Sequence, residues 1–429
     1  MSEKEYINRL FDKELEFYLK SVSGILIVGP KWCGKSRTAK KHSKTIIDLL
    51  IKKTRDQYVE LAKYAPEVLL SSGPKPILID EWQIISFIWN SIKEAIDESG
   101  EFGQFILTGS VTDRLVEDSK EIKHTGTGRI IKKVMRPMSL FESKDSNGKV
   151  SLSDLLNDKF TPCISDKDIT DYAFYICRGG WPLAIDEEKD VSLQQAKTFY
   201  EGLVTEDLFS LNDIKLEKNE ARARKLLRAY SRNISSQASN ESIKKDLSSS
   251  GDNIDNDTFN KYILALQRLY VIEELESWNT NLRSKTAIRT KNTRHFVDPS
   301  IAAVSLGINE KSIFKDMRTF GLLFESLVIR DLRIYCDSIG AKVYHYRDSL
   351  NREADAVIQF NDGSWALVEV KLGEKEEIKE ASNRLVKLSK DINNPYNPSP
   401  AFLMIITAQK VAYKDENGVI ITPLACIKP

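Results

Sequence analysis

The stretch Gly24-Ile-Leu-Ile-Val-Gly-Pro-Lys-Trp-Cys-Gly-Lys-Ser36 decides the fold of the N-terminal part of this chain. Residues 24–29 are a short apolar run, which predicts a buried strand, and a helix is expected over about 35–44. Between them, residues 29–36 satisfy the pattern G-x-x-x-x-G-K-[ST] in the strand-then-helix context that the pattern requires. The segment therefore predicts a phosphate-binding loop. The alternative is a glycine turn that precedes a helix by chance and has no role in binding.

In such a loop, backbone N–H groups close around a polyphosphate, and the dipole of the following helix adds to the attraction. Lys35 would neutralise phosphate charge, and the Ser36 hydroxyl would ligate Mg²⁺. The predicted cofactors are thus ATP and Mg²⁺. The predicted contact residues are Gly29, Pro30, Lys31, Trp32, Cys33, Gly34, Lys35, Ser36, Arg37 and, further along the chain, Ser110.

Two acidic residues end the apolar strand Ile77-Leu-Ile-Asp80, with Glu81 directly after Asp80. Asp80 would support the Mg²⁺ through its water shell, and Glu81 would act as the general base on the attacking water. The run Phe105–Ser110 ends another strand with polar side chains, which either contact the nucleotide or only cap the strand. The alternation of strands and helices over residues 24–110 predicts a parallel α/β sheet.

Arg129 closes the glycine-rich stretch His124–Arg129, beyond the last of these strands. It is either an arginine finger, acting on the nucleotide of its own chain or of a neighbouring subunit, or a solvated surface side chain.

The composition limits the possible functions. A length of 429 residues suggests about three domains. The 63 Lys and Arg nearly balance the 62 Asp and Glu, which excludes a globally basic nucleic-acid binder. Five widely separated cysteines indicate neither a disulfide framework nor a zinc site. Because no apolar run approaches a membrane span and the N-terminus has no signal-peptide core, we expect a cytoplasmic protein with no membrane partner.

Residues from about 140 to 270 have a mainly helical pattern. Helical segments at 226–238, around 242–247 and at 258–270, followed by a short strand at 271–275, predict a winged helix-turn-helix module. The predicted domains are a P-loop domain at 1–140, a helical lid or linker at 141–215, a winged-helix-like domain at 216–312 and a C-terminal α/β domain at 313–429.

Carboxylates are concentrated in two adjacent strands of this last domain. Asp355 lies in one strand and Glu369-Val-Lys371 ends the next, with the turn Asn361-Asp-Gly363 between them. Glu369 and Lys371 point to one face, so Asp355 and Glu369 can ligate a second Mg²⁺ or Mn²⁺ while Lys371 orients a hydroxide towards a phosphodiester. The alternatives are a hairpin with an ion-paired Lys and Glu, or a fold that has lost cleavage.

A basic stretch without acids follows the predicted winged-helix strand. Its residues Arg283, Lys285, Arg289, Lys291 and Arg294 would contact nucleic-acid phosphates, or the stretch is an intramolecular docking loop.

Several motifs along the chain carry a family resemblance. They are Asp80–Gln83, Gly103–Ser110, His124–Ile130, Met135–Ser143, Cys177–Pro182, Asn281–Arg289, Arg294–Ile301 and Phe320–Ser326. Together they resemble prokaryotic AAA-type ATPases with an uncharacterised C-terminal domain. The resemblance implies a P-loop ATPase core, a winged-helix middle and a restriction-endonuclease-like C-terminal domain, with the ATPase residues on Lys35, Ser36, Asp80, Glu81 and Arg129.

The spacing of Asp355, Glu369 and Lys371 resembles the PD-(D/E)xK nuclease signature. The resemblance adds Glu325, on the preceding helix, to the metal ligands. One departure is that Glu353-Ala-Asp355 stands where the signature has a Pro-Asp pair.

We therefore expect an ATP-hydrolysing protein whose nucleotide state controls a DNA-directed, metal-dependent nuclease-like domain. The alternative is a nucleotide-switched regulator that binds DNA or protein and does not cleave. A protein partner or a homo-oligomer is compatible with both.

Overall fold

The computed structural model describes residues 5–109, 128–211, 214, 216–249, 251–279, 291–392 and 398–429. The chain divides into two compact units. The first comprises residues 1–137 with 266–270, and the second comprises residues 138–265 with 271–429. The predicted division into four domains stays a prediction.

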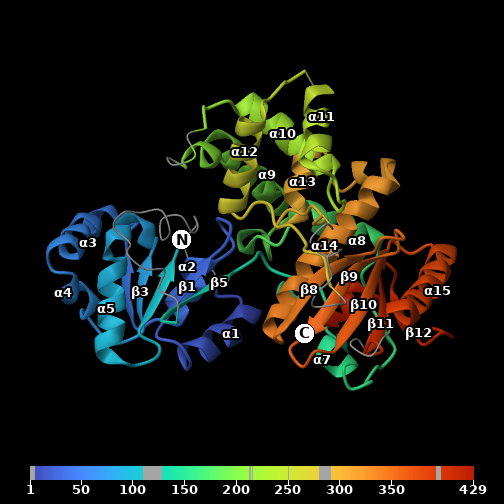
Figure 1. Cartoon of the computed structure of the whole chain (residues 1–429), viewed down its shortest axis with the longest axis horizontal. Helices are drawn as coiled ribbons and strands as arrows, with labels where there is room; N and C mark the ends of the chain where they lie inside the picture. Colours follow the sequence, from blue (N-terminus) through green and yellow to red (C-terminus); the bar gives the residue numbers. More distant parts are fainter. Residues whose placement is uncertain are drawn as a thin grey trace. The chain divides into compact units, whose positions relative to one another are not determined.

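The first unit contains a five-stranded sheet of order β2-β3-β4-β1-β5, in which every pairing is parallel (Figure 1). Its strands are β1 Gly24–Val28, β2 Thr45–Asp48, β3 Ile77–Asp80, β4 Phe105–Thr108 and β5 Ile130–Val134. The three central strands, β3, β4 and β1, are buried along their whole length, which explains their continuous apolar sequences. The predicted parallel α/β sheet is confirmed.

Helices cover both faces of this sheet (Figure 1). They are α1 Leu10–Leu19, α2 Lys35–Lys41, α3 Lys52–Tyr64, α4 Pro66–Leu70, the 3₁₀ helix η1 Trp82–Ile88 and α5 Trp89–Ser99. Successive residues of β1 point to opposite faces: Ile25 and Ile27 pack with α1 and α2, whereas Leu26 and Val28 pack with α3, α4 and α5.

The helical part of the second unit precedes its main sheet. Its α-helices are α7 Leu152–Leu155, α8 Ile169–Arg178, α9 Lys189–Thr205, α10 Glu220–Arg232, α11 Asn240–Ser249, α12 Asn256–Arg268 and α13 Pro299–Leu306. The predicted three-helix order is present as α10, α11 and α12. The predicted strand at 271–275 is wrong, because only the isolated antiparallel bridges Ile272–Phe296 and Leu275–Thr293 form there. The winged-helix assignment stays a proposal.

The second unit also contains a seven-stranded sheet of order β7-β12-β13-β11-β10-β9-β8. Its strands are β7 Cys163–Ile164, β8 Ala341–Arg347, β9 Glu353–Phe360, β10 Trp365–Lys371, β11 Phe402–Thr407, β12 Val411–Lys414 and β13 Ile420–Pro423, while β6 Val150–Ser151 pairs separately with β14 Ile427–Lys428. The predicted hairpin joins β9 and β10. Helix α14 Met317–Ser338 contacts β8, β9 and β10, and helix α15 Lys375–Ile392 packs on the sheet through its apolar face.

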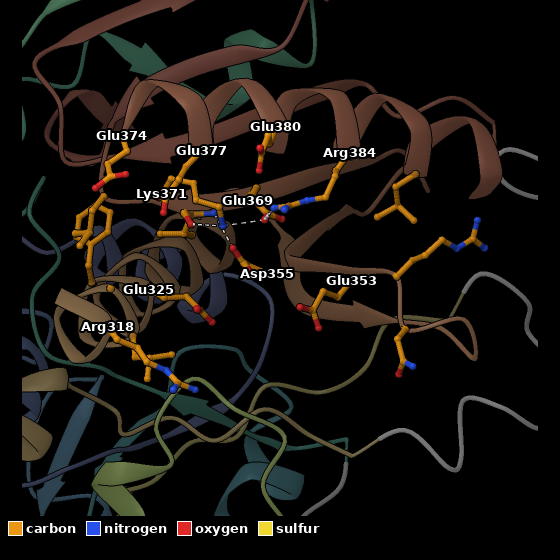
Figure 2. Close-up of a pocket in the computed structure, with 18 of the residues that line it drawn as sticks. Arg318, Glu325, Glu353, Asp355, Glu369, Lys371, Glu374, Glu377, Glu380 and Arg384 are labelled. Carbon is orange, nitrogen blue, oxygen red and sulfur yellow. Dashed lines mark hydrogen bonds and ion pairs between the residues drawn. The ribbon is translucent and has the colours of Figure 1, made fainter. Parts of the chain in front are cut away.

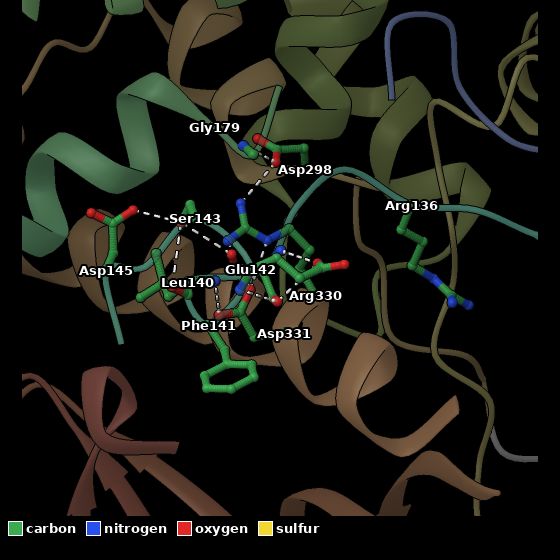
Figure 3. Close-up of polar contacts among 12 residues, drawn as sticks. Arg136, Leu140, Phe141, Glu142, Ser143, Asp145, Gly179, Asp298, Arg330 and Asp331 are labelled. Atoms are coloured by element: carbon green, nitrogen blue, oxygen red, sulfur yellow. Dashed lines mark hydrogen bonds and ion pairs between the residues drawn. The ribbon is translucent and has the colours of Figure 1, made fainter. Parts of the chain in front are cut away.

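A buried polar network connects four segments of the second unit (Figure 3). The Arg330 guanidinium, on α14, donates to Asp298 Oδ2 at 2.9 Å and to Asp331 Oδ1 at 2.7 Å. The same two aspartates accept the backbone N–H groups of Gly180 and Leu140. The side chains of the arginine and both aspartates are at most 1% exposed. The motifs 135–143, 177–182 and 294–301, which are distant in the sequence, therefore each supply a residue to one network.

Candidate functional site

The loop of residues 29–36 joins the C-terminal end of β1 to the N-terminus of α2. Gly29 has φ 145°, and a Cβ there would lie 2.1 Å from the Met135 carbonyl oxygen, so only glycine fits. Gly34, with φ 103°, is the N-cap of α2. The buried Lys35 turns back into the loop, where its Nζ donates to the carbonyl oxygens of Gly29 and Pro30 at 2.9 and 2.8 Å.

Asp80 connects the loop to the neighbouring strands. Ser36 Oγ donates to Asp80 Oδ1 at 2.8 Å, and Thr108 Oγ1 donates to the same oxygen. Lys40 Nζ lies 3.6 Å from Asp80 Oδ2. A hydroxyl and a carboxylate are the oxygen ligands that Mg²⁺ prefers, so Ser36 and Asp80 fit the predicted magnesium site.

Glu81 occupies a strained backbone position beside this cluster, with φ 59° and ψ 48°. Its backbone N–H donates to Thr108 Oγ1 at 3.2 Å, and its carboxylate accepts a hydrogen bond from Gln83 Nε2. Burial raises the pKa of Glu81, although the bond from Gln83 and the charge of Lys35 oppose the shift. A raised pKa suits a carboxylate that accepts a proton near neutral pH.

A cavity of about 980 Å³ opens in the second unit between α14, β9, β10 and α15 (Figure 2). Its lining includes Glu325, Asp355, Glu369 and Lys371, the residues predicted for the second metal site. The fold therefore brings all four residues to one cavity.

The carboxylates of this cavity already have partners within the chain. Glu369 is 6% exposed, and its Oε1 accepts hydrogen bonds from Lys371 Nζ at 2.9 Å and from Arg384 Nη2 at 2.6 Å. Asp355 Oδ2 accepts the backbone N–H of Val370 at 2.7 Å. Two cations of the chain thus neutralise Glu369, as in the ion-paired hairpin considered above.

No three His, Cys, Asp or Glu residues within the described ranges are grouped so that they could hold a metal ion. Glu325, Asp355 and Glu369 share a cavity, and their role as ligands of a second metal stays a prediction. Burial and the charge of Asp355 raise the pKa of Glu325. The carboxyl of Glu325 therefore tends to keep its proton.

The comparisons with known proteins cover three segments. Residues 22–144 match a family model described as an AAA domain. The N-terminal part of the chain is a P-loop domain of the AAA type. Two further models, both described as domains of unknown function (DUF8612 and DUF4143), match residues 169–312 and 320–427. No curated protein matches the chain.

Similarities to solved structures are weak. The Walker-type ATPase PABY2304 of Pyrococcus abyssi is 15% identical, over 71% of this chain and 97% of its own, at a TM-score of 0.44. A replication initiator DnaA bound to AMPPCP and single-stranded DNA, and the AMPPCP-bound DnaA of Aquifex aeolicus, are also 15% identical. Both cover 61% of this chain and 93% of their own, at TM-scores of 0.24 and 0.22. At these scores the similarities carry no argument about activity.

Lys40 was absent from the predicted set, and Thr108 was included only as part of the polar end of the strand Phe105–Ser110. Lys40 follows Ser36 by one helical turn on α2, a spacing that could have indicated its place near Asp80. Thr108 reaches Asp80 because β3 and β4 pair these two residues, a register that neither strand reveals alone. Ser110, the predicted contact in this segment, lies outside the described residues. Lys31, Trp32 and Arg37 of the predicted set are exposed.

The structure does not bring Arg129 to the phosphate loop of its own chain. The Arg129 carbonyl accepts the N–H of Gly24, at the N-terminal end of β1, whereas the loop follows the C-terminal end. The four residue-to-residue steps along β1 separate its two ends by roughly 13 Å. The Arg129 side chain is ion-paired with Asp97. A role in its own chain is therefore wrong, and a role in a neighbouring subunit stays a prediction.

The predicted nucleic-acid residues are only partly described. Arg283, Lys285 and Arg289 lie outside the described residues, and Lys291 is exposed. The Arg294 guanidinium pairs with Glu274 and donates to Asn240 and to the carbonyl of Ala238. These contacts fit the intramolecular alternative, and the role of Arg294 as a phosphate contact stays a prediction. None of the helices in the described ranges has the length and apolar character needed to cross a lipid bilayer.

The titration of Asp355 predicts a pH dependence of stability. Burial raises the pKa of Asp355 to about 7, whereas the pKa of an aspartate in an unfolded chain is about 4. The folded protein therefore keeps a proton that the unfolded chain loses, so the free energy of unfolding falls as the pH rises from about 4 to about 7. Asp355→Asn should be more stable than wild type above about pH 7 and equally stable below about pH 4.

Chemical denaturation of both proteins above and below this pH range measures the difference in their free energies of unfolding. A difference that is the same at high and low pH would contradict the prediction.

Proposed function

We propose that the AAA domain binds ATP with Mg²⁺ at residues 29–36 and hydrolyses it. The observation that carries the proposal is the hydrogen bond of 2.8 Å between Ser36 Oγ and Asp80 Oδ1. This bond joins two side chains 44 residues apart, directly beside a loop whose glycines and buried lysine suit a polyphosphate.

Each residue has a distinct role in this proposal. The loop N–H groups and Lys35 bind the phosphates, and Lys35 exchanges its carbonyl partners for phosphate oxygens. Mg²⁺ would be held by Ser36 and supported by Asp80, and when bound it neutralises charge on the phosphate oxygens. Glu81 accepts the proton of the attacking water, with Thr108 and Gln83 holding its backbone and carboxylate in place.

A titration with a fluorescent ADP analogue tests the binding step. We expect wild type to bind with Mg²⁺ more tightly than without it, and Ser36→Ala to lose about tenfold in affinity only when Mg²⁺ is present, because the lost oxygen is a metal ligand. Ser21→Ala, which removes an exposed hydroxyl at the end of α1, is the matched control and should bind like wild type. Wild type without measurable nucleotide affinity would refute the proposed function.

We propose that the domain with the C-terminal cavity binds a partner and does not cleave nucleic acid. The nucleotide state of the AAA domain would regulate this binding. Two observations favour this function over a nuclease. Lys371 and Arg384 neutralise Glu369. Carboxyl groups outnumber Lys and Arg in the cavity lining, eight to five, and still six to five without Glu325 and Asp355, whose pKa values are raised. An excess of negative charge repels the phosphate backbone of DNA. The chemistry of the cavity therefore suits a cationic protein segment better than a nucleic acid.

A plasmid-nicking assay with Mg²⁺ or Mn²⁺ distinguishes these functions. We expect wild type and Asp355→Ala to give the same low background, because Lys371 and Arg384 already neutralise Glu369. Nicking by wild type that disappears in Asp355→Ala would establish the nuclease instead. Filter binding at low and high salt would then show whether DNA binds at all, since a phosphate-mediated affinity falls steeply with salt.

A further inference from the structure

The segment that leaves the AAA domain runs against the phosphate loop. Strand β5 ends at Val134, and the next residue, Met135, donates its N–H to the Val28 carbonyl at 2.8 Å. The Met135 carbonyl oxygen accepts a hydrogen bond from Cys33 Sγ at 3.2 Å and passes so close to Gly29 that it excludes a Cβ there. Gly29 and Cys33, towards the two ends of the loop, therefore both lie against Met135, two residues before the first unit ends at Pro137.

The Arg9 side chain forms a second connection between the phosphate loop and the segment 135–137. Its Nη1 donates to the Cys33 carbonyl oxygen at 2.7 Å, and its Nη2 donates to the Arg136 carbonyl oxygen at 2.8 Å. Arg9 is only 7% exposed, so these hydrogen bonds compensate the desolvation of a charged group. Because the guanidinium is a rigid planar fork, a shift of one carbonyl requires a shift of the other or the loss of a bond.

The segment that carries Arg9 is itself anchored to α2. Asp12 accepts the Arg9 backbone N–H at 2.9 Å and contacts His42 Nε2 at 2.9 Å, where α2 ends. The Tyr6 hydroxyl lies 2.8 Å from Thr38 Oγ1, in the middle of the same helix. Although burial opposes it, the bond from His42 lowers the pKa of Asp12, which keeps the carboxylate charged. Arg9 is thus positioned by the helix that begins with Lys35.

We propose that Arg9 is a positioning residue that couples the conformation of the phosphate loop to the segment 135–137. Nucleotide binding draws Lys35 away from the loop carbonyls and rearranges the loop around Cys33. Arg9 then transmits this change to the Arg136 carbonyl, at the point where the chain enters the second unit. The inference rests on the proposed nucleotide binding and adds a route by which the nucleotide acts on the rest of the chain.

Hydrogen–deuterium exchange of the full-length protein, with and without Mg²⁺ and a non-hydrolysable ATP analogue, tests this inference. In wild type we expect the exchange of the peptide over residues 134–140 to change on nucleotide binding. Arg9→Ala should lose most of that change, while its nucleotide affinity falls by no more than about tenfold, the equivalent of one hydrogen bond. Lys13→Ala, an exposed residue on α1, is the control and should behave like wild type.

The outcomes separate this inference from the function on which it rests. Absence of nucleotide binding by wild type refutes both. Binding without a change over 134–140, or a full change in Arg9→Ala, overturns the coupling alone. If Arg9→Ala does not fold, Arg9→Lys decides, because lysine keeps the charge but cannot bridge both carbonyls as a fork. Loss of the change in that variant supports the inference, and its retention overturns it.

Discussion

Glu81→Gln is expected to slow ATP hydrolysis by about 10²–10³-fold while leaving nucleotide affinity nearly unchanged, because glutamine cannot accept the proton of the attacking water. The side chain keeps its size, so Gln83 and Thr108 still hold the segment in place. Steady-state release of phosphate measures the rate, and equilibrium titration with a fluorescent nucleotide measures the affinity.

The control for this variant is Glu98→Gln, an exposed glutamate on α5 of the same unit. It removes the same charge from the same unit and should hydrolyse ATP at the wild-type rate. Hydrolysis by Glu81→Gln at the rate of this control would exclude Glu81 as the base, and equal loss of binding and rate would indicate a structural role.

Arg330→Ala is expected to destabilise the second unit by about 3–5 kcal/mol, because it leaves Asp298 and Asp331 buried without their counter-charge. Burial already raises the pKa of Asp331, and the charge of Arg330 opposes that shift. Removal of the guanidinium therefore leaves the aspartates to be protonated or hydrated, which loosens the segments at Gly180 and Leu140. Urea unfolding followed by tryptophan fluorescence measures the loss, with separate transitions fitted for the two units.

Arg347→Ala is the matched control, because Arg347 lies in the same unit and pairs with Glu353 at 3.7 Å on the surface. An exposed ion pair contributes at most about 1 kcal/mol, so this variant should unfold almost like wild type. Equal unfolding midpoints for Arg330→Ala and Arg347→Ala would show that the buried network is not essential to the fold.

The sequence predicted the neighbours within the site of the AAA domain more completely than those within the C-terminal cavity. In the AAA domain, Lys35, Ser36 and Asp80 come together as expected, because a short loop and a strand end determine their places. In the C-terminal domain, Asp355, Glu369 and Lys371 also share one cavity. Their ionic partner Arg384, however, lies on α15, and no pattern in the strands indicated that it would neutralise Glu369.

The sequence by itself determined the features that depend on near neighbours. Gly29 and Gly34 mark backbone positions with positive φ, and apolar runs mark the buried strands, so the loop and the parallel sheet were predictable. Only the tertiary structure decided which distant groups meet. Arg129 directly precedes β5 at the N-terminal end of the strands, whereas the loop follows the C-terminal end of β1, and Arg9 reaches Arg136 across 127 residues. Such contacts depend on strand order, register and helix packing, and these arise only when the whole chain closes its core.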